Sequence, residues 1–189
     1  MQEHEDLRNF LKNLPFELTN AQVRTLNEIL SDIKQSYPMS RLVQGDVGSG
    51  KTAVAAVTAF AAITTKPDLS RLNTARNALS SNYQNINSSQ PKSLQKPDRV
   101  PSKTEPRGAG MIQVAYMCPT EILATQHFES FIKYFAYLGV SVGLITGSGC
   151  RKFPSKVNPK SWTPISKAQL LKWAANGEIP ILIGTHALI

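Results

Sequence analysis

Gly45-Asp46-Val47-Gly48-Ser49-Gly50-Lys51-Thr52 is the stretch of sequence that decides the fold. It matches the pattern Gly-x-x-x-x-Gly-Lys-[Ser/Thr], a phosphate-binding loop that needs a strand before it and a helix after it. Residues Ser40 to Gln44 predict a short strand, and the Ala- and Val-rich residues Lys51 to Ile63 predict a helix. The context that the loop requires is therefore expected on both sides.

The residue types in this loop suit a nucleoside triphosphate. Its glycines let the backbone N–H groups and the helix N-terminus face phosphate oxygens. Lys51 would place a positive charge on the β- and γ-phosphates, and the hydroxyl of Thr52 would ligate Mg²⁺. We therefore expect ATP and Mg²⁺ as cofactors, with Lys51 and Thr52 as the catalytic side chains; a plain glycine-rich turn is the alternative. The expected nucleotide-binding residues of the loop are Gly45, Asp46, Val47, Gly48, Ser49, Gly50, Lys51 and Thr52.

Outward from the loop, the spacing of apolar residues alternates between that of helices and that of strands. Helices are expected over residues 19–35, 120–136 and 167–175, and strands over residues 111–117, 140–145 and 179–184. This alternation predicts an α/β fold, a parallel sheet with helices on both faces. In such folds ligands bind at the carboxyl ends of the strands.

The segment from residue 64 to 110 interrupts this pattern. It is rich in Ser, Asn, Gln, Pro and Lys, and it carries eight Lys and Arg against three acids, most of the chain's net charge of +8. This composition predicts a flexible basic insertion. A solvated tether and a DNA-binding arm are both possible functions for it; we expect deletion to cost little stability and any DNA attraction to be salt-sensitive and sequence-independent.

The rest of the composition excludes several classes of protein. No apolar run reaches the roughly 18 residues of a membrane span, and acids near the start do not fit a secretory signal. Cys118 and Cys150 form no Cys-x-x-Cys pair, which favours a reducing compartment. We expect no membrane partner and a bacterial cytoplasm, or else an organelle with its targeting segment outside this sequence.

Five stretches, in this order, resemble the RecG family of ATP-dependent DNA helicases, within superfamily 2. The transcription-repair coupling factor shares the loop and the Gly-Thr-His strand end, and is the alternative relative. The stretches are Leu14 to Phe16 with Leu18 to Gln22; Arg41 to Thr52; Pro119 to Ala124 with Gln126-His127; Thr146 to Ser148; and Gly184 to Ile189.

This resemblance implies a RecA-like motor domain that acts on branched DNA without reading its sequence, as a monomer. It implies that Gln22 reads the adenine edge, although Thr19 and Gln22 also fit a capping box, which alone would explain them. It further implies that three pairs of residues hold the DNA backbone. These pairs are Pro119 and Thr120, Thr146 and Gly147, and Thr185 and His186. Thr120 could instead cap its helix, and His186 could be a buried histidine.

The sequence departs from the family in its acidic residues. RecG helicases have an Asp-Glu-x-His box after the Gly-Thr-His strand, whereas here Glu178 is the only acid after Cys150. We therefore expect residues 1–189 to form an incomplete RecA-like domain, without the wedge domain and the second motor domain. The isolated chain is expected to bind ATP weakly and to hydrolyse it negligibly. A truncated product without activity, or a non-motor phosphate-loop protein such as a nucleotide switch or kinase, are the alternatives.

Overall fold

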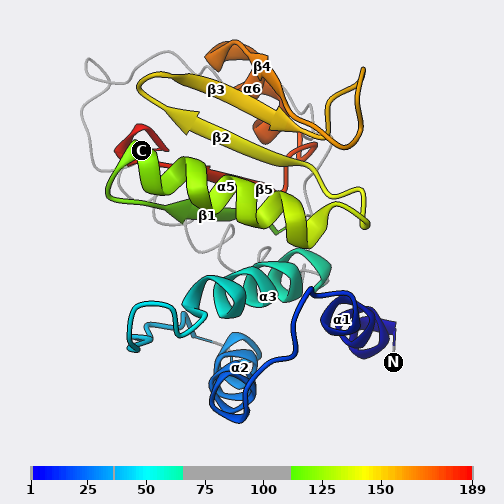
Figure 1. Ribbon diagram of the computed structural model, residues 1–189, viewed down its shortest axis with the longest axis vertical. Helices are drawn as coiled ribbons and strands as arrows, with labels where there is room; N and C mark the ends of the chain where they lie inside the picture. Colours follow the sequence, from blue (N-terminus) through cyan, green and yellow to red (C-terminus); the bar gives the residue numbers. More distant parts are fainter. Residues whose placement is uncertain (1, 36, 66–111, 189) are drawn as a thin grey trace, which may run out of the picture.

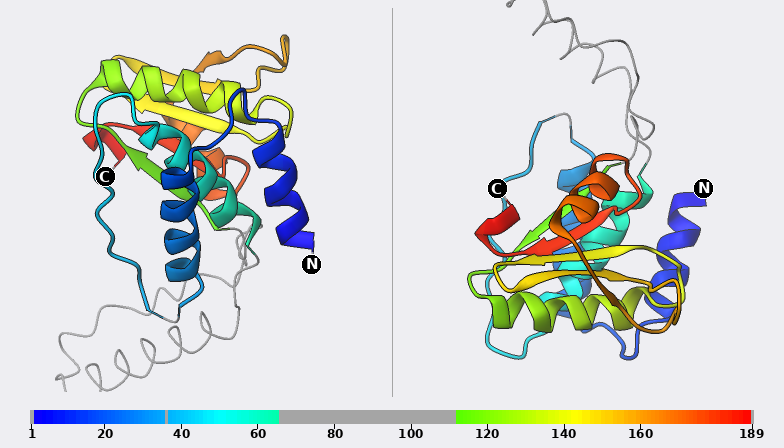
Figure 2. Two further views of the ribbon diagram at one scale, coloured as in Figure 1. Left: turned by 60° about the horizontal axis from the view of Figure 1, so that its bottom comes forward. Right: turned by 90° about the horizontal axis from the view of Figure 1, so that it is seen from above.

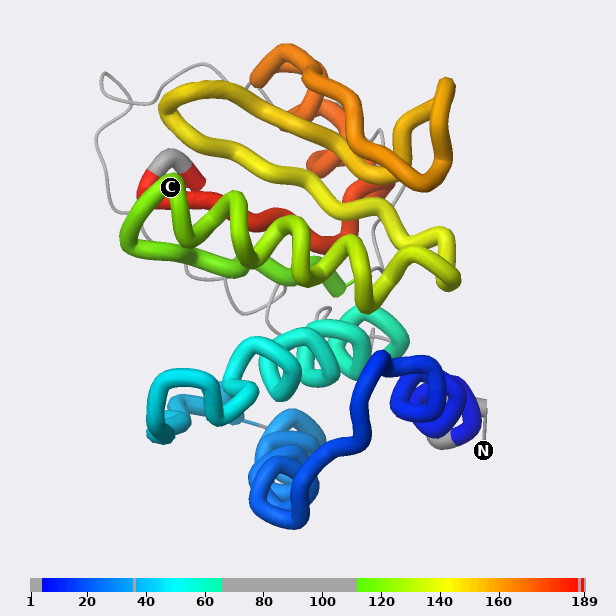
Figure 3. Tube along the Cα trace, viewed as in Figure 1, coloured from blue at the N-terminus to red at the C-terminus, as the bar shows by residue number. Residues whose placement is uncertain are grey.

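The computed structural model describes residues 2–35, 37–65 and 112–188. Three helices come first: α1 (Gln2–Lys12), α2 (Asn20–Ile33) and α3 (Lys51–Thr64). Figure 1 shows α3 lying between the sheet and the other two helices, and the Cα trace in Figure 3 shows the same order of layers. The helix that follows the phosphate-binding loop is therefore the central element of the N-terminal half.

The two predicted N-terminal helices are confirmed. Thr19 caps α2: its Oγ1 accepts from the backbone N–H of Gln22, and the Gln22 side chain accepts from the Thr19 N–H. This capping box satisfies two N–H groups that a helix start would otherwise leave unpaired. The Ala- and Val-rich helix α3 buries residues all round, from Ala53 to Ala61, which is typical of a helix packed on two sides.

Within the described residues, the sheet has five strands in the order β1-β5-β2-β3-β4. Strands β1 (Val114–Met117), β5 (Ile181–Gly184) and β2 (Val142–Thr146) are parallel, as expected. Strand β3 (Gly149–Phe153) pairs with β2 in antiparallel fashion, and β4 (Thr163–Ile165) pairs with β3 in the same way. The prediction of a parallel sheet is thus correct for three strands. The antiparallel extension was not predicted, because β3 carries Arg151 and Lys152 and β4 contains Pro164, so neither shows the apolar run of the other strands.

Helices cover both faces of the sheet, as predicted. Helix α5 (Glu121–Phe135) packs on one face and α6 (Lys167–Ala175) on the other, and Figure 2 shows the strands between them. Successive residues of β2 divide accordingly: Leu144 packs in the cluster with α5, and Ile145 packs in the cluster with α6. The strand alternation thus gives the sheet two apolar faces, one covered by α5 together with α3 and the other by α6.

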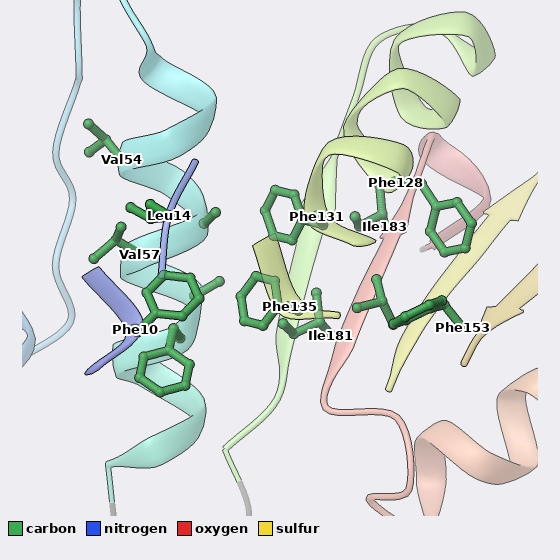
Figure 4. Packing of buried hydrophobic residues seen from close by; sticks show 14 of the residues in the cluster. Phe10, Leu14, Val54, Val57, Phe128, Phe131, Phe135, Phe153, Ile181 and Ile183 are labelled. Carbon is green, nitrogen blue, oxygen red and sulfur yellow. The ribbon is translucent and has the colours of Figure 1, made fainter. Parts of the chain in front are cut away.

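Aromatic side chains join the N-terminal helices to the sheet. Phe10 of α1 stacks on Phe60 of α3, with ring centroids 4.4 Å apart, and also contacts Phe135 of α5. Figure 4 shows Phe131 and Phe135 in the space between α3 and the strands, with Phe10 against α3; all three belong to one buried cluster. Helix α1, which the sequence analysis did not predict, is therefore a part of the core.

The strand predicted at Ser40 to Gln44 is wrong. These residues have no assigned secondary structure, and Leu42 is 88% exposed. The physical reason is that no strand among the described residues pairs with this segment, so its backbone has no ladder to join. Local composition suggested a strand, but strand formation needs a neighbour.

The predicted insertion at 64–110 falls almost entirely outside the described residues; only Thr64 and Thr65 are described, at the end of α3. Cys118 and Cys150 are both buried and both free. Over residues 2–35, 37–65 and 112–188, we find no helix with the length and apolar character needed to cross a membrane.

Gly184 lies where a side chain does not fit, and this gives a test of the sheet. A Cβ at residue 184 would overlap the backbone carbonyl oxygen of Ile145, whereas a Cβ at Gly143 would meet the tips of two flexible leucines, at 2.7 and 2.9 Å. We expect Gly184→Ala to destabilise the fold by about 1–3 kcal/mol and Gly143→Ala to cost less. Thermal melting of the two variants measures this; equal losses would show that β5 and β2 are packed differently.

Candidate nucleotide-binding site

The phosphate-binding loop joins the unpaired segment before it to helix α3. Gly48 and Gly50 have φ of +82° and +81°, a left-handed conformation that favours glycine. Gly50 is the N-cap of α3 and supplies no side-chain cap, so the first N–H groups of the helix are not satisfied by a side chain. This end of α3 therefore has the donors and the dipole direction that suit a phosphate.

Lys51 folds back over the loop. Its ammonium donates to the carbonyl oxygens of Gly45, at 2.7 Å, and Asp46, at 2.6 Å. It also lies 3.4 Å from the Ser49 hydroxyl oxygen. The Lys51 ammonium is thus held over the loop, where it can bind an anion that occupies the loop.

Gln22 contacts the loop directly. Its side-chain N–H donates to the carbonyl oxygen of Ser49, at 2.9 Å, while its Oε1 remains in the capping box with Thr19. A Cβ at Gly50 would overlap the Gln22 amide. The capping box is thus confirmed, and the same side chain also supports the loop. Its role toward adenine remains a prediction.

Arg41 holds the segment before the loop against α2. Its guanidinium donates to Asp32, at 2.6 Å, and to Glu28, at 2.7 Å. The hydrogen bond from Arg41 lowers the pKa of the Asp32 carboxyl below its ordinary value. The two acids are four residues apart and so share one face of α2. This clamp takes the place of the strand pairing that the segment lacks.

Thr52 faces helix α5. Its Oγ1 lies 3.4 Å from Nδ1 of His127, and Tyr116 of β1 packs its ring against the His127 ring. Partial burial lowers the pKa of His127 below its usual value, which favours the neutral imidazole. A cavity of about 540 Å³ is bordered by Lys51, Thr52, His127 and Tyr116, together with apolar side chains of α3.

The described residues contain no cluster of three or more His, Cys, Asp or Glu side chains that could hold a metal ion alone. Thr52 can supply one hydroxyl ligand at the end of a helix whose N–H groups can hold a phosphate. A Mg²⁺ that arrives already bound to phosphate oxygens needs few protein ligands. The loop and Thr52 therefore fit a nucleotide-bound Mg²⁺.

The residues expected to contact nucleic acid come together at one edge of the sheet. Because β1, β5 and β2 are parallel, their carboxyl ends lie side by side, with Met117 opposite Gly184 and Gly184 opposite Ile145. Each strand end carries one of the three predicted pairs: two of the pairs follow β1 and β5, and the third begins at Thr146, the last residue of β2. Pro119, Thr120, Gly147 and His186 are exposed, Thr185 is partly exposed, and Thr146 is buried.

Two of the hydroxyls at this edge already have partners. The Thr120 side chain caps α5 by accepting from Leu123 N–H, and the Thr146 hydroxyl lies 3.0 Å from the Gly149 carbonyl oxygen, to which it donates. Glu121, which the sequence analysis gave no role, accepts from the Ser148 N–H at 3.2 Å and so ties the β2–β3 turn to α5. The edge therefore offers mainly backbone groups, the hydroxyl of Thr185 and the ring of His186.

Comparison with known proteins gives consistent matches. The family model described as DEAD/DEAH box helicase matches residues 19–189. The chain is 39% identical over 186 residues to the ATP-dependent DNA helicase RecG of Bacillus subtilis, covering 98% of this chain and 19% of that protein. It is 36% identical to the Aquifex aeolicus RecG, covering 97% of this chain and 16% of the relative. The chain thus spans about a fifth or less of the length of the curated relatives it matches.

Proposed function

This chain belongs to the DEAD/DEAH box helicase family, and from that membership we propose that it is the ATP-binding part of an ATP-dependent DNA helicase that remodels branched DNA. The observation that carries the proposal is the loop of residues 45–52. Its uncapped helix end and the Lys51 ammonium converge on one place where phosphates can bind. The names of the relatives, ATP-dependent DNA helicase, supply the reaction and the substrate class.

Each part of the loop has a distinct task in nucleotide binding. Backbone N–H groups of the loop and of the first turn of α3 would hold the phosphates, and Lys51 would leave its two carbonyl partners for the β- and γ-phosphate oxygens. Thr52 would hold Mg²⁺, which neutralises charge that develops on the phosphates. Gln22 donates to the carbonyl oxygen of Ser49 and thereby fixes the position of the loop relative to α2. We propose that the same amide also reads adenine.

The DNA strand would lie along the carboxyl edge of the sheet, across the ends of β1, β5 and β2. Backbone N–H groups and hydroxyls that follow these strands can hold phosphates without reading bases, which suits a motor that moves along any sequence. Pro119, Thr120, Gly147 and His186, which are exposed, are the proposed contacts with the freest access. Stalled forks and recombination intermediates are the proposed substrates, in DNA repair and recombination.

The test of this function is phosphate-dependent nucleotide binding. We expect the chain to bind a fluorescent ATP analogue saturably in the presence of Mg²⁺. ATP and ADP should displace the analogue, and AMP should compete far less well, because the loop and Lys51 hold the β- and γ-phosphates. Fluorescence anisotropy with the three competitors measures this. Absence of saturable binding, or equal competition by AMP and ATP, would refute the proposal.

A further inference from the structure

Thr52 differs from the other threonines of helix α3 in what its hydroxyl can bond. Thr58 and Thr64 donate to the carbonyl oxygens four residues earlier, at Val54 and Phe60, both at 2.9 Å. The residue four before Thr52 is Gly48, which has a φ of +82° and lies in the loop rather than in the helix. The helix therefore offers Thr52 no backbone acceptor, and its hydroxyl needs an outside partner to fix its direction.

His127 is the described side chain that meets this hydroxyl. Its Nδ1 lies 3.4 Å from Thr52 Oγ1, across 75 residues of sequence. The ring is held in place by the edge-on ring of Tyr116, with centroids 5.1 Å apart and an interplanar angle of 62°. The next residue, Phe128, is fully buried, which anchors this turn of α5. These contacts therefore restrict the rotation of the His127 side chain and fix the position of Nδ1.

We propose that His127 is a positioning residue: its Nδ1 accepts the hydroxyl proton of Thr52 and thereby turns the oxygen lone pairs of Thr52 toward a nucleotide-bound Mg²⁺. A threonine hydroxyl has one proton to donate and two lone pairs to offer. When the proton is directed to His127, both lone pairs are left for the metal. This inference rests on the proposed function, since it needs the loop to bind a nucleotide with Mg²⁺.

The inference fixes the tautomer of the ring. If Nδ1 carried the proton, the ring would donate to Thr52 Oγ1 and occupy one of the lone pairs that the metal needs. The neutral ring must therefore carry its proton on Nε2. Nitrogen chemical shifts of His127 in an NMR spectrum of the labelled chain report which nitrogen is protonated.

Three variants of His127 distinguish the effect of its hydrogen-bond acceptor from the effect of its ring packing on Tyr116. His127→Asn places an amide oxygen near the position of Nδ1, and His127→Gln places its amide near the position of Nε2. His127→Phe keeps a ring against Tyr116 but has no acceptor. The measurement is the affinity for a fluorescent ATP analogue, with EDTA and again with Mg²⁺, so that the gain due to the metal is obtained for each variant.

We expect His127→Phe and His127→Gln to lower the Mg²⁺-dependent gain about threefold to tenfold, the effect of one lost hydrogen bond. Their affinity with EDTA should stay near that of the unchanged chain, and His127→Asn should keep most of the gain. Glu129→Gln, an exposed change on the same helix, is the matched control and should alter neither value.

An unchanged Mg²⁺ gain in both His127→Phe and His127→Gln would overturn the inference, as would a loss of equal size with and without Mg²⁺. A ring protonated on Nδ1 would also overturn it. If His127→Phe does not fold, as judged by circular dichroism, the comparison of the Gln and Asn variants still decides. Nucleotide binding that survives in the unchanged chain while these tests fail would leave the proposed function standing, whereas no binding by the unchanged chain would refute the function itself.

Discussion

Lys51→Ala is expected to remove most of the chain's affinity for ATP. The Lys51 ammonium makes two charge-assisted hydrogen bonds to loop carbonyls, at 2.7 and 2.6 Å, and it is the positive charge of the proposed phosphate-binding loop. A hydrogen bond to a charged group contributes about 1.5–3 kcal/mol, so we expect an affinity loss of roughly 10- to 100-fold. Titration with a fluorescent ATP analogue and Mg²⁺ measures it.

The fold should survive this change. Gly45 and Asp46 are exposed, so water can replace the ammonium at their carbonyl oxygens. Circular dichroism checks the fold, and Lys133→Ala, an exposed lysine in the last turn of α5, is the matched control for the loss of one charge. If Lys51→Ala bound ATP as well as the unchanged chain, the loop would be a turn without a ligand.

Phe135→Ala is expected to cost about 3–5 kcal/mol of the free energy of unfolding. Phe135 is fully buried, and its ring meets those of Phe10, Phe60 and Phe131 at centroid distances of 5.2, 6.2 and 5.7 Å. It thus joins α5 to α1 and α3, and truncation leaves a cavity where these three helices meet. A loss of this size is a large share of the roughly 5–15 kcal/mol that stabilises a typical domain.

Phe16→Ala provides the comparison, because Phe16 is 39% exposed and has a single aromatic neighbour, Tyr134, at 5.8 Å. We expect its cost to be about 1 kcal/mol or less. Urea unfolding of both variants gives the two values. A cost at Phe135 no greater than that at Phe16 would mean that the N-terminal helices do not share a core with the sheet.

The sequence predicted most of the regular elements because their signals are local. Thr19 and Gln22 form the predicted capping box, and the helix predicted at residues 167–175 has those bounds in the structure. The buried face of α5, with Ala124, Phe128, Phe131 and Phe135, follows helical spacing. Such signals lie within a few residues, and so a single sequence contains them.

Four features were not predicted; for the first two the sequence has no clear local signal, and for the other two it has one. Ser40 to Gln44 has the composition of a strand but no strand beside it among the described residues. Strands β3 and β4 lack an apolar run, because β3 carries Arg151 and Lys152 and β4 contains Pro164. Helix α1 was missed although Leu7, Phe10, Leu11 and Leu14 follow helical spacing, a signal that could have found it. The Arg41 clamp could also have been suspected, because Glu28 and Asp32 are four residues apart on one predicted helix.

For the candidate site, the sequence by itself determined the loop, its lysine and threonine, and the glycines that allow its conformation, because these groups are adjacent in the chain. Only the tertiary structure decided which distant groups support them: Gln22 on Ser49, 27 residues away, and His127 on Thr52, 75 residues away. The carboxyl ends of β1, β5 and β2 likewise meet only because the three strands pair in parallel. Contacts of this kind depend on how burial of apolar side chains closes long loops of chain, which no local pattern encodes.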